Sequence, residues 1–117
     1  MRATDEIEER LGMGVELLKT GLSECDNMPV ITIFINDDYK TKVLYPAQNE
    51  NSQDFIERLK GLSKDYNPDI IVGCDPIDKK EYDGLIIAVH VETKENRSFY
   101  HKKGNKINEG WEETFDL

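Results

Sequence analysis

The two histidines of this sequence, His90 and His101, are the side chains best suited to bind a metal ion. They lie on either side of a turn that the residue pattern places near 94–97. If they stand opposite each other in a hairpin, their Cβ atoms are about 5 Å apart and the two imidazoles can share a metal. Glu92 or Cys74 is then the candidate third ligand. The ordinary alternative is a pair of packed or solvated imidazoles.

The register of this hairpin decides whether the two histidines can share a metal ion or are only packed or solvated. A two-residue turn at 95–96 places the histidines opposite each other. A three-residue loop at 94–96 instead sets Val91 opposite Phe99, which is the better apolar pair, and separates the histidines. The residue pattern leaves both registers open.

A second candidate site combines the stretches "NPD" and "VETK". Together they resemble the PD-(D/E)xK nuclease superfamily, in which two carboxylates hold a divalent metal and a lysine orients or activates water. The resemblance implies that Asp69 and Glu92 are ligands and that Lys94 assists. It makes these residues, with His90, the catalytic candidates of a metal-dependent hydrolase or nuclease-like protein. That family places a helix after its Glu-x-Lys strand, whereas here "NRSFYH" follows.

Other catalytic patterns are missing from the sequence. It contains no GxSxG nucleophile motif and neither of the phosphate-binding patterns GxGxxG and GxxxxGK[ST]. Cys25 and Cys74 form no CxxC pair, so reduced thiols are expected. The acidic loop "CDPIDKKEYDG" lacks the DxDxDG spacing of a calcium site. We therefore expect no cofactor.

The net charge of the chain indicates which classes of partner it can bind. The chain has 24 acidic and 15 basic residues and a net charge of −9, which repels phosphate backbones and anionic lipid headgroups. Its basic cluster, Arg97, Lys102, Lys103 and Lys106, also fits the lysine-rich edge that discourages strand aggregation. An apolar leader and a membrane-length run are both lacking. We expect a cytoplasmic protein that binds neither membranes nor nucleic acids.

The candidate residues must be positioned by a small fold, since 117 residues suit a single domain over 1–117. Two helices are predicted, one near the N-terminus and one that is capped by Asn51 or Ser52 and ended by Asn67-Pro68. Gly12 and Gly14 mark either a close packing contact or a mild defect in the first helix. The apolar stripe of that helix consists of Ile7, Leu11, Val15, Leu18 and Leu22.

Five strands are predicted between and after these helices. "VITIFIN" and "KTKVLYP" form a hairpin through "NDDY", "DIIVGCD" forms a short buried strand, and "DGLIIAVHVET" with "RSFYHKK" forms a second hairpin. The class is α+β, in the order α-β-β-α-β-β-β, with a mostly antiparallel five-stranded sheet packed against two amphipathic helices. Residues 107–117 form either an edge strand or a mobile tail.

This order of elements is similar to that of the roadblock/longin and profilin-like scaffold domains, which bind partners and often dimerise. The second half, with Asp83-Gly84 before an aliphatic strand and a late Trp111, also resembles small prokaryotic proteins of families without an assigned function. We expect a non-enzymatic domain that binds a protein partner or itself through Tyr100, Trp111 and Phe115. The alternatives are the metal-dependent hydrolase and a small-ligand binder.

Overall fold

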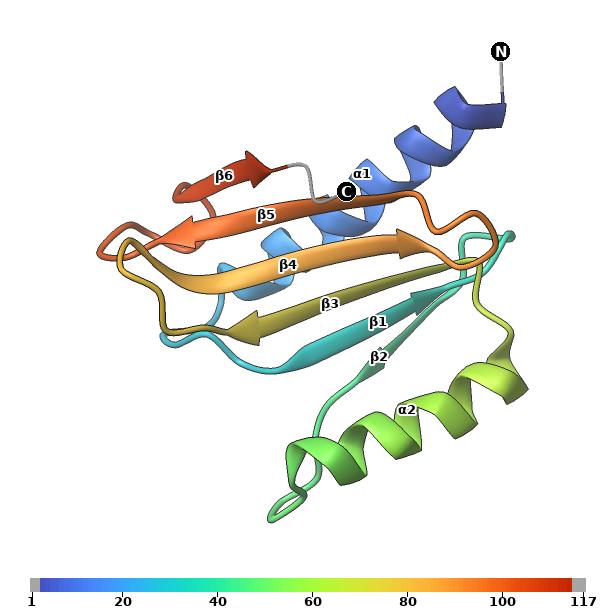
Figure 1. Cartoon of the computed structure of the whole chain (residues 1–117), viewed down its shortest axis with the longest axis horizontal. Coiled ribbons are helices and arrows are strands. Elements are labelled where there is room, and N and C mark those ends of the chain that lie inside the picture. Colours follow the sequence, from blue (N-terminus) through green and yellow to red (C-terminus); the bar gives the residue numbers. More distant parts are fainter. Residues whose placement is uncertain (1–2, 115–117) are drawn as a thin grey trace.

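The computed structural model describes residues 3–114, which form two helices and a six-stranded antiparallel sheet (Figure 1). Strand order in the sheet is β2-β1-β3-β4-β5-β6. Within the described part of the chain, no helix has both the length and the apolar composition required to cross a bilayer. The elements are α1 (Ala3–Leu22), β1 (Ile31–Ile35), β2 (Thr41–Leu44), α2 (Ser52–Tyr66), β3 (Ile70–Pro76), β4 (Tyr82–His90), β5 (Asn96–Lys102) and β6 (Trp111–Thr114).

The sheet has one strand more than the sequence predicted. The predicted α+β class, the two helices and the antiparallel pairing are confirmed, but the count of five strands is wrong. The sixth strand, β6, pairs with β5 and sets Trp111 opposite His101. Its four residues are mostly polar and show no alternation, so its strand structure depends on the backbone of β5 rather than on a local pattern.

Helix α1 forms because its apolar side chains recur about every 3.6 residues and face the sheet together. The buried members of this stripe are Leu11, Val15, Leu18 and Leu22. Gly14 lies on the same face, and a Cβ built there would stand 2.6 Å from Val72 Cγ2. Gly14 therefore marks a close helix-to-sheet contact, whereas a Cβ on Gly12 would meet no atom within 4 Å.

The main core lies between α1 and one face of the sheet. Successive residues of a strand point to opposite faces, so alternate residues of β1, β3 and β4 meet α1. The sheet contributes Ile31, Ile33, Ile35, Ile70, Val72, Cys74, Ile86 and Ala88 to this core. All five residues of β1 are buried, which is typical of a strand that is covered on both faces.

The hairpin of β4 and β5 adopts neither of the two predicted registers. Ile86 lies opposite Phe99, and residues 91–95 form the loop. His90 is therefore at the loop end of the hairpin, while His101 lies near its other end. The expectation that the two histidines could stand opposite each other is wrong.

Hydrogen bonds within the loop explain its greater length. The amide of His90 donates to Glu95 O at 2.8 Å, and the amide of Lys94 donates to His90 O at 2.9 Å. Lys94 is left-handed, with a φ of 66°, and the Thr93 amide donates to His90 Nδ1 at 3.3 Å. These contacts satisfy backbone groups that a tighter turn would pair across the strands. A sequence pattern that considers only the length of the turn does not predict these hydrogen bonds, because the side chain of His90 takes part in them.

Helix α2 begins and ends where the sequence predicted. Asn51 is its N-cap, and the side-chain oxygen accepts a hydrogen bond from the Asp54 amide at 2.8 Å. Asn67 ends the helix in the left-handed conformation with a φ of 53°. Asparagine tolerates this conformation better than most residues, and Pro68 follows it, which disfavours a further helical turn.

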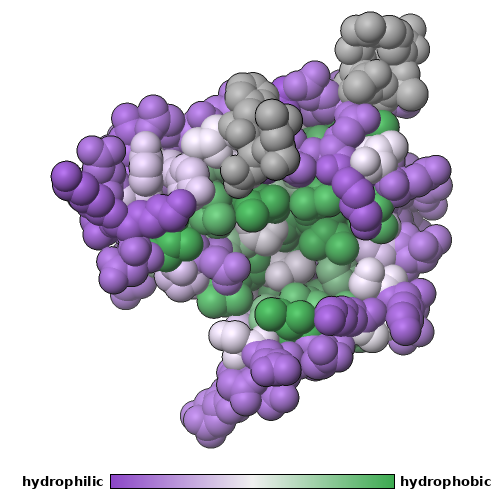
Figure 2. All heavy atoms as spheres, viewed as in Figure 1, coloured by the Kyte–Doolittle hydropathy of each residue, from purple (hydrophilic) through white to green (hydrophobic). Residues whose placement is uncertain are grey.

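Helix α2 covers part of the sheet face opposite α1. Arg58 Nη2 donates to Tyr45 O at 2.6 Å, and Tyr66 Oη donates to Lys40 O at 3.0 Å, so the helix is tied to both ends of β2. Its buried side chain is Phe55. Figure 1 shows α1 behind the sheet and α2 beside β2, and Figure 2 shows apolar side chains gathered in the middle of the uncovered face.

Candidate functional site

A groove runs along the face opposite α1, between α2 and the uncovered strands. Two cavities of about 520 and 680 Å³ lie beside α2 and share Thr32 and Gly73. A third cavity, of about 210 Å³, continues from Gly73 over β4. We call these joined cavities the sheet-face groove and define it by Ile56, Ile71, Gly73, Leu85, Ile87 and Val89.

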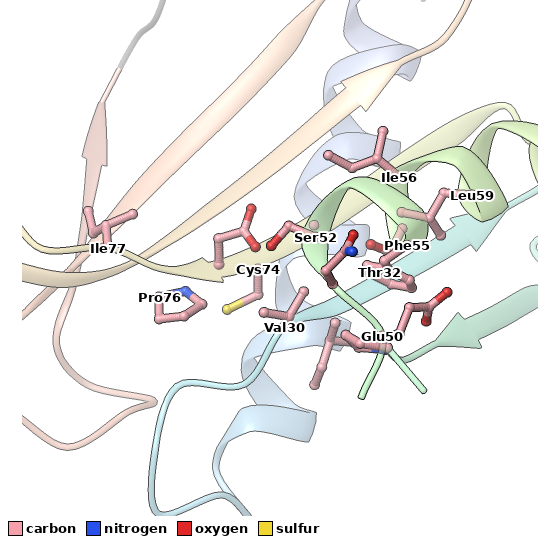
Figure 3. Close-up of a pocket in the computed structure, with 15 residues that line it drawn as sticks. Val30, Thr32, Glu50, Ser52, Phe55, Ile56, Leu59, Cys74, Pro76 and Ile77 are labelled. Atoms are coloured by element: carbon pink, nitrogen blue, oxygen red, sulfur yellow. The ribbon is translucent and has the colours of Figure 1, made fainter. Parts of the chain in front are cut away.

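The end of the groove beside the start of α2 is shown in Figure 3. Phe55 and Leu59 of α2 lie close to Thr32 of β1, and Pro76 and Ile77 lie at the opposite end of this cavity. The lining is mainly apolar. Such a surface recognises a ligand by shape and apolar contact, with few directional hydrogen bonds.

Strands β3 and β4 supply the apolar floor. Leu85, Ile87 and Val89 alternate with core residues along β4 and are half-buried, as is Ile71 of β3. A Cβ built on Gly73 would meet no heavy atom within 4 Å, so the floor is open above this residue. Contiguous apolar surface of this kind on a monomer usually marks a site of interaction.

An ion pair fixes the start of α2 beside the groove. Arg58 Nε and Nη2 donate to the two carboxylate oxygens of Glu50 at 3.0 and 2.9 Å. The amide of Ala47 donates to Glu50 Oε1 at 2.7 Å. The Arg58 hydrogen bonds, and then the Ala47 amide, lower the pKa of Glu50. The carboxylate is therefore charged at neutral pH and holds the loop against the helix.

An aromatic pair borders the groove on its β5 side. Tyr100 lies opposite Leu85 and stacks on Tyr82, with ring centroids 5.0 Å apart. Lys79 Nζ donates to Tyr100 Oη at 3.0 Å, and Tyr82 Oη donates to Glu112 at 2.6 Å. The bond to Glu112 raises the pKa of Tyr82. Because these hydroxyls are already engaged, the rings offer mainly apolar contact to a ligand.

A separate group of polar residues, Arg10, Asp69, His90 and Thr93, meets at one end of the sheet, and we call it the polar cluster. His90 Nε2 lies 3.3 Å from Asp69 Oδ1, and Arg10 forms an ion pair with the same carboxylate. His90 Nδ1 accepts the Thr93 amide at 3.3 Å and lies 2.9 Å from Thr93 Oγ1. The ring hydrogen therefore lies on Nε2 and faces Asp69. Arg10 also donates to Asn36 O at 3.1 Å.

The polar cluster has the hydroxyl, imidazole and carboxylate groups with which many hydrolases activate a nucleophile. The same groups also make contacts that support the fold. Thr93 Oγ1 accepts the Glu95 amide at 3.3 Å, and the adjoining cavity of about 230 Å³ is lined by Asp69 and Glu92 but not by Thr93. We interpret the cluster as a tie that joins α1, the end of β1, β3 and β4.

The structure brings together part of the predicted catalytic set. Asp69 contacts His90 and lines the same cavity as Glu92, whereas Lys94 is exposed on the 91–95 loop. Arg10 already neutralises the Asp69 carboxylate, which weakens its attraction for a cation. Among residues 3–114, no group of three or more His, Cys, Asp or Glu side chains is arranged to hold a metal ion.

The other predicted metal ligands lie apart from the polar cluster. His101 is buried, with Nδ1 2.6 Å from Asp83 Oδ1 and Nε2 3.2 Å from Lys106 O. Cys74 is buried in the main core, and burial, followed by the nearby charge of Asp75, raises the pKa of its thiol to about 12. Because the thiolate is the metal-binding form, Cys74 is a poor ligand at neutral pH.

The predicted partner-binding aromatics have different surroundings. Tyr100 and Trp111 are half-buried, and the Trp111 ring meets His101 edge-on with centroids 4.8 Å apart. Phe115 lies outside the described residues. Among the residues whose side chains the structure describes, the exposed large apolar ones are Met13, Leu17, Tyr39, Val43, Tyr45 and Ile56. Sequence reasoning missed these residues, although Val43 and Ile56 interrupt polar stretches of β2 and α2.

Most of the predicted basic cluster is paired with carboxylates. The ion pairs are Arg97 with Glu8 and Glu113, Lys102 with Glu112, and Lys103 with Asp78. These pairs reduce the positive potential that a phosphate backbone would meet.

The comparisons with known proteins add no family. No protein-family model matches this sequence, and searches of curated proteins and of solved structures found no significant match. The function is therefore inferred from the geometry of this chain.

Proposed function

We propose that this protein is a protein-binding domain that holds an amphipathic helix of a partner in the sheet-face groove. The observation that supports this proposal is the row of half-buried apolar side chains beside α2, on a face of which α2 covers one part. Helices that pack on a sheet lie side by side. A helix from a partner, laid next to α2, would bury this row.

The partner helix should be apolar on one face and basic on the other. Its apolar face would contact Ile71, Leu85 and Ile87. The net charge of −9 favours a basic partner, and Asp75 and Glu112 place carboxylates near the groove. A second copy of this chain carries the same negative charge and lacks that complementarity.

A titration followed by nuclear magnetic resonance tests the proposal. The probe is a synthetic peptide with leucines on one helical face and lysines on the other. We expect methyl signals of Ile71, Leu85, Ile87 and Val89 to shift on binding, while those of Leu11, on the buried face of α1, stay in place. A peptide of the same composition without the leucine stripe is the control, and equal binding of both peptides would argue against the proposal.

A pair of charge-matched variants locates the binding surface. Ile87→Lys puts a cation into the groove and should weaken peptide binding about tenfold or more, roughly 1.4 kcal/mol. Val43→Lys makes the same change of charge on β2, outside the groove, and should leave the affinity within about twofold of the original. Equal loss in both variants would attribute binding to net charge alone.

Saturation of the groove by a small apolar dye but not by the peptide would favour the small-ligand alternative.

A further inference from the structure

We infer that the outer edge of β2 is a second docking site, which takes an extended segment of a partner protein as an added strand. This goes beyond the proposed function, because the site lies at another edge of the molecule and uses none of the residues that define the sheet-face groove. It stands on three observations: exposed apolar side chains, outward-pointing backbone groups, and the charge at both ends of the strand.

The first observation is an apolar hollow between α1 and β2. A cavity of about 260 Å³ is lined by Leu17, Val43 and Tyr45, which are 43, 45 and 58% exposed. Met13 of α1 and Tyr39 of the preceding turn are also exposed, and Met13 lies one helical turn from Leu17. Most of the exposed large apolar side chains named above therefore belong to this one region.

The second observation is the direction of the backbone groups of β2. The Asn36 amide donates to Lys40 O at 3.1 Å, so these two residues form a hydrogen-bonded pair of the hairpin. Such pairs alternate along antiparallel strands with pairs whose backbone groups point outward. Thr41 and Val43 are in the second class, and their N–H and C=O groups point away from β1.

The edge already accepts one donor from outside the sheet. Tyr45 is the next outward-pointing residue, and its carbonyl oxygen accepts Arg58 Nη2 at 2.6 Å. This contact covers one end of the edge and leaves Thr41 and Val43 for an incoming strand. Addition of a strand supplies affinity through the main chain and specificity through alternate side chains.

The third observation is the acidic charge at both ends of β2. Glu24 and Asp26 flank Cys25, which lines one end of the hollow, and Asp37 and Asp38 stand in the turn before β2. All four carboxylates are exposed. They outnumber the two exposed lysines of this edge, Lys40 and Lys42, and favour a segment with apolar alternate residues and a lysine or arginine at each end. Antiparallel pairing of two copies of this chain would instead bring acidic ends together, which argues against a second copy.

The test uses a fluorescently labelled peptide of alternating valine and threonine with two lysines at each end. Fluorescence anisotropy measures its binding, and amide hydrogen exchange locates the bound site. We expect binding to protect the amides of Thr41 and Val43. Val43→Pro removes an outward N–H without removing a bond to β1, and it should weaken binding about tenfold. Val43→Thr keeps the N–H and should bind within about threefold of the original.

Other variants distinguish failure of this site from failure of the groove. Leu17→Lys should also abolish binding, because it adds a positive charge and removes an apolar contact. Since Leu17 lies on α1, this variant leaves β2 intact and serves as the test if Val43→Pro does not fold. Ile87→Lys, in the sheet-face groove, should have no effect. Unchanged binding by Val43→Pro and Leu17→Lys, or equal binding of a peptide with glutamates in place of lysines, would overturn the inference. So would a doubled molecular mass that Val43→Pro abolishes, because it assigns the edge to a second copy.

Discussion

Asp69 shows how a single carboxylate joins several elements. It lies before β3 and contacts both Arg10 of α1 and His90 of β4. The side chains of Arg10 and His90 are 14 and 6% exposed, so water cannot readily replace a lost partner. Removing one member of such a group costs more than the net gain from forming it.

We therefore predict that Asp69→Ala lowers the free energy of unfolding by about 2–3 kcal/mol, because it leaves a largely buried guanidinium without a counter-charge. Urea denaturation followed by circular dichroism measures the change. Asp65→Ala, at an exposed position on α2, is the control and should stay within about 0.5 kcal/mol of the original. Equal effects of the two substitutions would show that the polar cluster does not tie the elements together.

Cys74 permits a prediction about reactivity. Burial raises the pKa of its thiol to about 12, so almost none of it is thiolate at pH 8. Iodoacetamide should modify the half-buried Cys25 much faster than Cys74 in the folded protein, and the two should react alike in urea. Peptide mass spectrometry reads the ratio. Rapid modification of folded Cys74 would contradict its place in the main core.

The sequence predicts the role of a single residue well where that role depends on residues nearby in the chain. Asn51 and Asn67 cap α2 as their positions indicated, because capping depends on residues a few positions apart. The polar cluster escaped notice because Arg10, Asp69 and His90 come from distant segments. The PD-(D/E)xK resemblance did select Asp69 and Glu92, but it also selected Lys94, which is exposed on a loop, and His90 was singled out by a separate argument about the two histidines.

At the scale of elements, α2 is held by a few side chains. Phe55 is its buried side chain, and Arg58 connects the helix to Glu50 and to Tyr45 O. The Arg58 hydrogen bonds, and then the Ala47 amide, lower the pKa of Glu50. A carboxyl whose pKa is lower in the folded state stabilises that state above its ordinary pKa, and the contribution is lost as pH falls through the lowered value.

The attachment of α2 should thus weaken in acid. We predict that the Glu50 carboxyl carbon titrates, by nuclear magnetic resonance, with a midpoint below that of an ordinary glutamate. Arg58→Gln removes the cation and should raise this midpoint towards the ordinary value. Lys60→Gln, an exposed position on the same helix, should leave it unchanged. A Glu50 midpoint that is insensitive to Arg58→Gln would mean that the ion pair does not form in solution.

Periodicity predicted both helices and the hairpin of β1 and β2, because each has a clear alternation or stripe of apolar residues. It left β6 open, with residues 107–117 predicted as either an edge strand or a mobile tail, because this segment has neither pattern, and it failed for the register of β4 and β5. Both predicted registers assumed a short turn. The side chain of His90 instead caps the 91–95 loop, a contact that no strand pattern contains.

At the scale of the whole molecule, the two faces of the sheet differ. Helix α1 buries one face, while α2 leaves the floor of the sheet-face groove half-buried. The sequence shows that β4 has apolar residues at both alternate sets of positions. It does not show that α2 stops short of β4, because the position of α2 depends on ties to β2 through Arg58 and Tyr66.

A substitution at Gly73 can block binding without lowering stability, because a side chain there would fill the sheet-face groove without a clash. Valine suits a strand better than glycine. We predict that Gly73→Val keeps or raises the melting temperature and occupies the space that a partner helix needs. Gly14→Ala provides the contrast, because its Cβ would press on Val72 and should lower the melting temperature.

The most direct test of the central claim is an anisotropy titration of the leucine and lysine amphipathic peptide with the original protein and with Gly73→Val. The account predicts saturable binding to the original protein and an affinity about tenfold or more weaker for a fully folded Gly73→Val. Equal affinity for the two proteins, or no binding to either, would contradict the assignment of the sheet-face groove as a helix-binding site.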